Sequence, residues 1–321
     1  MGITNADLAR LRCPIAPCDA QVDFAGSVGA KTGFLESGVL TCRSGAHHAF
    51  GVRGGIPFLV SEADVSGMDA ILRPIYDMIA PVHDAGVKYM LAALQFPDPR
   101  ARRQNYIAKL EFGGLARGPG EEKPRILEVG IGAGANVHLI DAALPVSQDA
   151  EIWGVDLSSG MLDEARRRLE GRPDRVVRLA LADAHALPFA DSTFDRVFSV
   201  GCANGYRNPK QALAEMARVA KPGTPIVVVD EELDPKRDHL PLHRVLFRAL
   251  TAYDANPHAP LEAVPDGAIA CEVTPVSRFY YCLCFRMPAP PRERPPLPAA
   301  GGTPPRALPG GSAPAGPGPH A

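Results

Sequence analysis

The feature that most constrains the fold of this 321-residue chain is an alternation between residues 124 and 286. Short apolar runs, each about the length of a buried strand, are separated by segments whose apolar residues follow helical spacing. Strands that are apolar on both faces suit a parallel sheet with helices on both sides. The runs are RILEV, EIWGVD, VVRLALAD, FDRVFSV and PIVVVD. We therefore expect an α/β domain over residues 119–287.

Two local signals refine this expectation. Asn208 can cap a helix, and Pro209 fits the first turn of that helix, where a missing N–H costs nothing. The domain ends on IACEVTPVSRFYYCLCFRM, which consists of two β-rich runs around a short turn. We therefore expect the sheet to close with an antiparallel hairpin and not with another crossover.

Three other segments differ from this domain in composition. Residues 1–62 are rich in glycine and carry three of the seven cysteines, which indicates a small β-rich module with little apolar surface to bury. Residues 63–118 predict a helical cap, because several apolar residues share one helix face. These are Ile71, Ile75, Met78 and Ile79. Residues 288–321 are rich in Pro, Ala and Gly, and we expect this tail to be disordered.

Composition limits the class of protein. With 46% hydrophobic and 22% charged residues, the chain reads as an ordinary soluble globular protein. A formal net charge of −2 provides no basic field, which counts against tight non-specific binding of nucleic acid. We find no signal-peptide pattern and no run of eighteen apolar residues, and an odd number of cysteines suits a reducing compartment. The expected location is the cytoplasm.

The sharpest chemical signal is the segment ILEVGIGAGANVHLI. A buried strand leads into Gly130, Gly132 and Gly134 and then into a helix, which brings bare backbone against a nucleotide-like ligand. The dinucleotide fingerprint requires the spacing G-x-G-x-x-G, whereas here G-x-G-x-G is followed by Ala135 and Asn136. This spacing disfavours a dehydrogenase with a nicotinamide cofactor.

Three carboxylates surround this loop in the predicted sheet. Glu128 precedes the loop, Asp156 ends the second strand and Asp183 ends the third. Carboxylates suit a ligand that carries an amine, a ribose diol and an exocyclic amino group but no phosphate. S-adenosylmethionine is such a ligand, and its sulfonium is cationic.

Four motifs in this order resemble class I S-adenosylmethionine-dependent methyltransferases of the ubiquinone-biosynthesis-like type, methyltransferase type 11. They are LEVGIGAGAN, GVDLSSGMLDEAR, LADAHALPFADSTFDRVFSV and ARVAKPG, and the match covers roughly residues 120–286. The resemblance implies a Rossmann-like, seven-stranded sheet with an antiparallel last strand, and S-adenosyl-L-methionine as methyl donor.

The resemblance also implies a donor site. The backbone of the three loop glycines would contact the methionine part of the donor, with Glu128 near its amino group. Asp156 would hold the ribose hydroxyls, with Leu157 beside it, and Met161 would pack on the adenine. The adenine edge would be read by Asp183 and by the backbone of Ala184.

The acceptor site is less constrained. Methyl transfer is an in-line displacement that depends mainly on positioning, and it needs a base only when the acceptor must lose a proton. We name His83 as the first candidate base, because it falls on the segment that should cover the site, and Tyr206 as the second candidate. Further candidates are Tyr76, Asp84, Asn204, Glu231, His239 and His243.

Cysteines and histidines near the N-terminus form a candidate metal site. The segments CPIAPC and CRSGAHHAF offer Cys13, Cys18, Cys42 and either His47 or His48. Zinc is commonly held by two chelating pairs, although both spacings here are longer than the commonest pattern. The alternative is a module with free thiols and two surface histidines.

A second resemblance concerns this module. The segment AFGVRGGIPFLV resembles the end of the small Trm112-like zinc-ribbon domains that precede some methyltransferases. By comparison with zinc-carrying rRNA guanine methyltransferases, His48, two residues before Phe50, is the favoured fourth ligand. Three thiolates and an imidazole leave no open position on zinc, so the ion would be structural.

We therefore expect a methyltransferase that acts on a small-molecule acceptor, such as a quinone, a phenol, a lipid head group or a natural product. One alternative is an RNA methyltransferase, suggested by the zinc module and by arginines at 100, 102, 103 and 166–168. Another is a scaffold that binds the donor without turnover. The sequence leaves the oligomeric state open.

Overall fold

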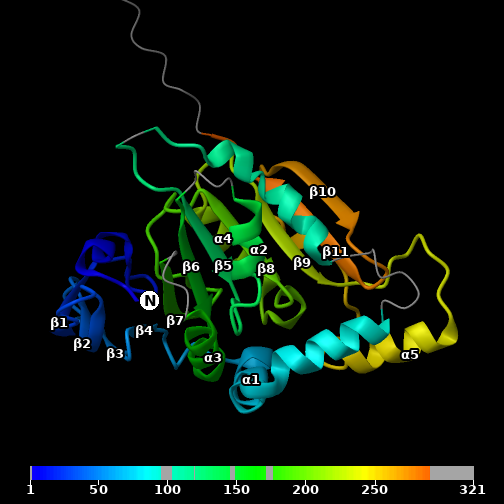
Figure 1. The fold of residues 1–321 in the computed structure, drawn as a ribbon, viewed down its shortest axis with the longest axis horizontal. Helices are drawn as coiled ribbons and strands as arrows, with labels where there is room; N and C mark the ends of the chain where they lie inside the picture. The colour runs from blue at the N-terminus through cyan, green and yellow to red at the C-terminus, as the bar shows by residue number, and fades with distance from the viewer. Residues whose placement is uncertain (1, 95–102, 119, 145–148, 171–175, 290–321) are drawn as a thin grey trace, which may run out of the picture. The chain divides into compact units, whose positions relative to one another are not determined.

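The sheet is the framework of the fold. The structure, a computed structural model, describes residues 2–94, 103–118, 120–144, 149–170 and 176–289. Within these residues eleven strands form one mixed sheet in the order β1-β2-β3-β4-β7-β6-β5-β8-β9-β11-β10 (Figure 1). Most of the tail that was expected to be disordered, residues 290–321, lies outside the described part of the chain.

Five parallel strands form the centre of the sheet, and each corresponds to one of the apolar runs. They are β7 (Val177–Ala182), β6 (Glu151–Asp156), β5 (Arg125–Val129), β8 (Arg196–Val200) and β9 (Ile226–Glu231). Three helices connect them: α2 (Val137–Ala143), α3 (Ser159–Leu169) and α4 (Pro209–Val219). The expected parallel core is therefore confirmed.

Alternate residues of the strands enter two separate cores. Leu127 of β5 belongs to the same core as Leu213 of α4, whereas Ile126 belongs to the core that contains Ile140 of α2. Burial on both faces explains why these strands are apolar without alternation.

The start of α4 is as expected, since the side chain of Asn208 accepts a hydrogen bond from the backbone N–H of Gln211.

The antiparallel closing hairpin is also confirmed. β11 (Tyr280–Arg286) lies between β9 and β10 (Ile269–Pro275) and runs antiparallel to both. Its register places Tyr280 opposite Glu231 and Cys282 opposite Val229.

The N-terminal strands extend the sheet. β1 (Val22–Val28), β2 (Leu35–Cys42) and β3 (Ala49–Arg53) are antiparallel, and β4 (Ile56–Leu59) pairs in parallel with β7 through Phe58 with Leu181 and Leu59 with Ala182. The expectation of seven strands beside a separate β module is therefore wrong in strand count. The physical reason is that β4 covers the edge of β7, whose backbone groups would otherwise lack partners.

A buried ion pair reinforces this junction. Asp7, in the 3₁₀ helix Asn5–Arg10, accepts a hydrogen bond of 2.8 Å from Nε of Arg178 on β7, and both side chains are buried. The Arg178 guanidinium also lies 5.2 Å from the ring centre of Trp153. The module is thus held to the sheet by this ion pair as well as by strand pairing.

The segment after β4 forms the expected helix, α1 (Gly67–Leu94), which contacts the N-terminus of α3. Oδ1 of Asp77 accepts hydrogen bonds from Oγ of Ser158 (2.6 Å) and from the backbone N–H of Gly160 (2.8 Å). A Cβ on Gly160 would lie 2.7 Å from the carbonyl oxygen of Asp77, so only glycine permits this approach. The remaining helices are α5 (Pro241–Leu250) and the 3₁₀ helices Arg103–Leu110, Phe112–Leu115, Ala203–Gly205 and Leu261–Ala263.

The contact between α1 and α3 predicts the effect of removing Asp77. Asp77→Ala takes away an acceptor that caps α3, so we expect the free energy of unfolding in urea to fall by about 1–2 kcal/mol. Asp163→Ala is the matched control, because Asp163 lies exposed on α3 and pairs with Arg166 at 3.0 Å. Equal losses in the two variants would contradict the docking role of Asp77.

Candidate functional site

A cavity of about 710 Å³ lies at the carboxyl ends of the parallel strands, with α1 as one wall. This volume is within the usual range of small-molecule sites. Seven of the nine residues expected to bind the donor line the cavity, whereas Glu128 and Gly134 do not. The seven are Gly130, Gly132, Asp156, Leu157, Met161, Asp183 and Ala184.

The glycine loop is held tightly against β6. The backbone N–H groups of Gly130 and Ile131 both donate to the carbonyl oxygen of Val155, at 2.8 and 3.0 Å. Gly130, Gly132 and Gly134 have φ values of 74°, 53° and 72°, a region that favours glycine. A Cβ on Gly130 would also lie 2.2 Å from Sγ of Cys202, so only glycine fits where the loop packs against Cys202.

Asp156 connects the loop to the end of β6. Its Oδ2 accepts from the backbone N–H of Gly132 at 2.8 Å, and its Oδ1 accepts from that of Ser158 at 2.9 Å. Burial raises the pKa of Asp156, and these two hydrogen bonds oppose that rise. Each oxygen can accept a further hydrogen bond, so the carboxylate suits a ligand with two adjacent hydroxyl groups.

Glu128 lies behind the loop, outside the cavity lining. It is fully buried, and its Oε1 accepts a hydrogen bond of 2.5 Å from Nδ2 of Asn136, just before α2. In this position the carboxylate joins the end of β5 to the residues that follow the glycine loop. Its expected contact with an amino group stays a prediction.

Asp183 is held in a charged network. Its Oδ1 accepts from the backbone N–H and Nδ1 of His185, and its Oδ2 accepts from Arg207 at 2.7 Å. Burial acts to raise the pKa of Asp183, but the hydrogen bonds from His185 and Arg207 outweigh it and lower the pKa to about 2. Arg207 also pairs with Asp69 of α1 and so supplies the positive charge between these two acids.

The tautomer of His185 follows from its two partners. Nε2 accepts a hydrogen bond from the backbone N–H of Asn208, so Nδ1 carries the proton and donates it to Asp183 at 2.6 Å. His185 therefore fixes the orientation of the Asp183 carboxylate at the cavity wall. No pattern in the sequence pointed to this role of His185.

Met161 lies where α1 covers the cavity. It is buried and packs with Ala133 of the glycine loop and with Tyr76 and Ala80 of α1. The thioether is flexible and polarisable, so it can adapt to a flat ring placed against it.

The proposed acceptor residues divide into two groups. Tyr76, His83, Tyr206 and Glu231 line the cavity, whereas Asn204, His239 and His243 do not. The side chain of Asp84 lies outside the described part. The rings of Tyr76 and His83 meet edge to face with centres 5.6 Å apart, which fixes the imidazole against the same wall.

Tyr206 is a neutral group in this site. Its hydroxyl shares a hydrogen bond of 3.0 Å with Oγ of Ser199, and burial raises the pKa of the phenol well above its usual value. Such a group can donate a hydrogen bond to an acceptor but does not become a base near neutral pH.

Two tyrosines that the sequence analysis missed also line the cavity and hold Glu231. The hydroxyl of Tyr253 donates to Oε2 at 3.0 Å, and that of Tyr280 donates to Oε1 at 3.1 Å. Behind Glu231, burial and then the charge of Glu231 raise the pKa of Asp230. The register of β11 on β9 could have indicated the role of Tyr280, because this register places Tyr280 opposite Glu231.

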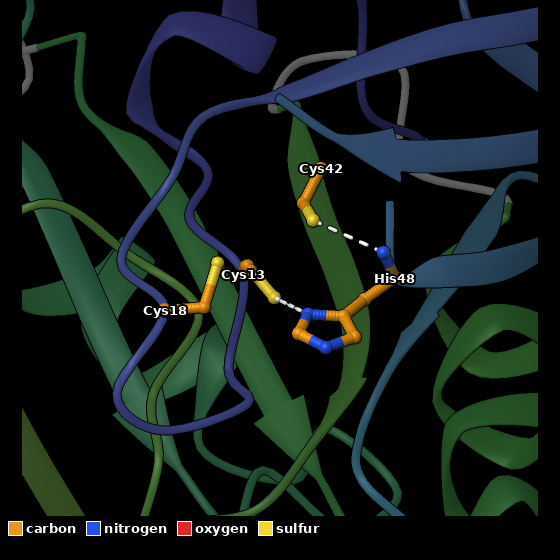
Figure 2. A group of neighbouring side chains, drawn as sticks. All are labelled: Cys13, Cys18, Cys42 and His48. Atoms are coloured by element: carbon orange, nitrogen blue, oxygen red, sulfur yellow. Dashed lines mark hydrogen bonds between the residues drawn. The ribbon is translucent and has the colours of Figure 1, made fainter. Parts of the chain in front are cut away.

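The N-terminal module brings four candidate metal ligands together (Figure 2). The ligand atoms of Cys13, Cys18, Cys42 and His48 all lie within 4.8 Å of one another. Nδ1 of His48 is 3.3 Å from Sγ of Cys13, and the backbone N–H of His48 donates to Sγ of Cys42 at 3.1 Å. His47 is exposed and is not part of this group, so the geometry favours His48 over His47.

The donor set suits a soft divalent cation. Burial, followed by the neighbouring thiols, raises the pKa of Cys13 to about 12, although a backbone hydrogen bond opposes this. A thiol in such a setting is deprotonated when it coordinates a metal. Three sulfur atoms and one imidazole nitrogen are a common ligand set for structural zinc.

Comparison with known proteins identifies the segment that contains the site. Residues 127–228 match the family described as the methyltransferase domain. A demethylmenaquinone methyltransferase of Symbiobacterium thermophilum is 34% identical over 153 residues, which cover 47% of this chain and 55% of that protein. A demethylmenaquinone methyltransferase of Tropheryma whipplei is 32% identical over 179 residues, which cover 56% of this chain and 66% of that protein.

Among solved structures, phosphoethanolamine N-methyltransferase 2 of Haemonchus contortus, in complex with S-adenosyl-L-methionine, is 17% identical. The matched part covers 61% of this chain and 60% of the chain of that structure, with a TM-score of 0.43. The chain spans about half the length of the curated relatives it matches. The segment that matches the methyltransferase domain contains the glycine loop, Asp156 and Asp183, which all line the cavity.

Proposed function

We propose that this chain is an S-adenosylmethionine-dependent methyltransferase that acts on a small-molecule acceptor. The observation that carries the proposal is the cavity at which the glycine loop, Asp156 and Asp183 meet. All of them fall within residues 127–228, the segment that matches the methyltransferase domain. The relatives named as demethylmenaquinone methyltransferases favour a quinone-like acceptor.

The residues of the cavity fit the donor in their chemistry. Bound S-adenosylmethionine would supply an electrophilic methyl group on a positively charged sulfur. Asp156 would accept hydrogen bonds from the ribose hydroxyls, and Met161 would pack against the adenine, with Leu157 beside it. The backbone at Gly130 and Gly132 would lie against the methionine part, and Asp183 with Ala184 would read the adenine edge.

The acceptor side of the cavity is aromatic and mostly uncharged at its surface. Tyr76, Tyr206 and Tyr253 line it, and Arg73, which also lines the cavity, is paired with Glu62 at 2.6 and 3.0 Å. Aromatic walls suit a flat acceptor, and a paired arginine offers little to a phosphate. These contacts favour a quinone or phenol over a phosphorylated head group.

The chain's part in the transfer is to hold the acceptor in line with the methyl group and to take up a proton where one is released. We propose His83 as the base, because it lines the cavity and is held by Tyr76. Tyr206 would donate a hydrogen bond to an acceptor oxygen, since its raised pKa keeps it protonated.

An RNA acceptor is less well supported. Arg166 and Arg167 pair with Asp163 and Glu164 on their own helix, at 3.0 and 2.5 Å. Such pairing is typical of a solvated helix face. The arginines at 100 and 102, and the side chain of Arg103, lie outside the described part.

A transfer assay tests both the reaction and the acceptor class. The full-length protein is incubated with methyl-labelled donor and either total RNA or an organic extract of metabolites. We expect label in the organic extract. Label confined to RNA would replace the small-molecule acceptor with RNA, and no label in either would contradict the proposed activity.

The same assay tests His83 once an acceptor is found. His83→Ala should lower turnover at least ten-fold, because positioned proton transfer typically contributes that much or more, and it should leave the KM for the donor unchanged. His239→Ala is the control, since His239 is outside the cavity lining. Unchanged turnover in His83→Ala would remove it from the mechanism.

We also propose that Cys13, Cys18, Cys42 and His48 hold a structural zinc ion. The proposal is supported by the closeness of the four ligand atoms and by their origin in two segments of the chain, one before β1 and the other from the end of β2 to the start of β3. A closed set of four ligands leaves no position for substrate, so the ion would stabilise the module and take no part in transfer.

Metal analysis tests this site directly. We expect about one equivalent of zinc in the purified protein. Cys42→Ser should lower the free energy of unfolding by at least about 2 kcal/mol, because metal binding in a small module contributes directly to folding, and it should change donor affinity less. The exposed Cys271, replaced by serine, is the control. A metal-free protein of undiminished stability would contradict the site.

A further inference from the structure

Over residues 67–86 one face of α1 is exposed, and none of its side chains of described burial is charged. Over residues 67–86, every exposed residue of described burial is apolar or glycine. The large side chains among them include Ile71, Met78 and Val82, which are 58%, 75% and 65% exposed. Single exposed apolar residues are common, but a continuous stripe along a helix marks an interaction surface. The exposed residues are Gly67, Ala70, Ile71, Pro74, Ile75, Met78, Pro81, Val82, Ala85 and Gly86.

The second helix at this edge of the molecule, α5, has an amphipathic exposed face. Leu242 and Val245 are 62% and 64% exposed on one side of the helix. Arg244 and Arg248 are exposed beside them on the same helix. Five charged side chains are exposed over residues 236–250. Four are cations and one is an anion: Lys236, Arg237, Arg244 and Arg248, and Asp238.

The two helices meet at the cavity. Ile75 and Val82 of α1 are exposed and also line the cavity, as does Leu250 at the end of α5. Figure 1 shows α1 and α5 along the same edge of the molecule. The apolar surface is therefore continuous from solvent to the cavity wall.

We propose that α1 and α5 form a docking surface for an anionic lipid bilayer. The apolar stripe of α1, with Leu242 and Val245 of α5, would enter the boundary between head groups and acyl chains. The cations beside it would meet the anionic head groups, an arrangement typical of helices that lie in a membrane interface. None of the described helices is long and apolar enough to cross a membrane, so this contact would be made at its surface.

Charge distinguishes a bilayer from a second copy of the chain. A two-fold interface uses the same patch on both subunits, so it would bring four cations and one anion from each side together. Like charges across an interface oppose association. An anionic lipid surface instead complements the cations. The docking surface does not depend on the proposed reaction, because it is defined by exposure and charge alone.

Vesicle flotation of the full-length protein tests this surface without donor or acceptor. We expect binding to vesicles of phosphatidylglycerol and phosphatidylcholine, weaker binding at high salt, and little binding to phosphatidylcholine alone. Arg244→Glu combined with Arg248→Glu should weaken binding to the anionic vesicles by at least roughly twenty-five-fold, about five-fold for each arginine lost.

The apolar stripe is tested with matched variants. Met78→Glu and Val245→Glu should each reduce binding at least about ten-fold, because each puts a charge into the buried part of the contact. Val39→Glu is the control, since Val39 is 43% exposed on β2 in the N-terminal module. Circular dichroism checks that each variant is folded.

Three outcomes would overturn the proposal. The wild-type protein could fail to float with anionic vesicles, or Val39→Glu could reduce binding as much as Met78→Glu. Light scattering could also show a dimer that Met78→Glu dissociates, which would assign the stripe to a second copy of the chain.

Discussion

The site depends on the parallel pairing of β5 with β6 on one side and β8 on the other. Parallel strands present their carboxyl ends at one edge of the sheet, so this pairing brings the glycine loop, Asp156 and the residues after β8 to the same place. Two hydrogen bonds to the carbonyl oxygen of Val155 then fix the loop against β6. Buried apolar side chains on both faces of β5 hold the arrangement, and the carboxylates of Asp156 and Glu128 join the loop to its neighbours.

The wall formed by α1 is attached to that edge through polar contacts. Asp77 accepts hydrogen bonds at the start of α3, and Asp69 shares Arg207 with Asp183. The second contact links the wall to a residue of the proposed donor site, because the same guanidinium binds both carboxylates. Apolar packing of α1 against Met161 adds to these contacts. The exposed apolar face of α1 takes no part in these contacts and is available to a binding partner.

The sequence predicted the parts that local periodicity controls. Spacing and residue type predicted the five parallel strands, the closing hairpin and a helix in the segment that holds α1. Residue type and resemblance together predicted the cluster of Cys13, Cys18, Cys42 and His48. The parallel pairing of β4 with β7 could not be predicted, because it involves two residue pairs far apart in the chain. The two tyrosines on Glu231 were missed for a similar reason. Tyr280 reaches it through strand register, and Tyr253 through the path of the chain after α5.

Donor binding is the central claim, and calorimetric titration of the full-length protein with S-adenosyl-L-methionine tests it most directly. We expect a single site, at least ten-fold weaker binding by Asp156→Ala in a variant that circular dichroism shows to be folded, and no binding of a nicotinamide dinucleotide. A folded protein that binds no S-adenosyl-L-methionine, or an Asp156→Ala variant that binds it as tightly as the wild type, would contradict the account.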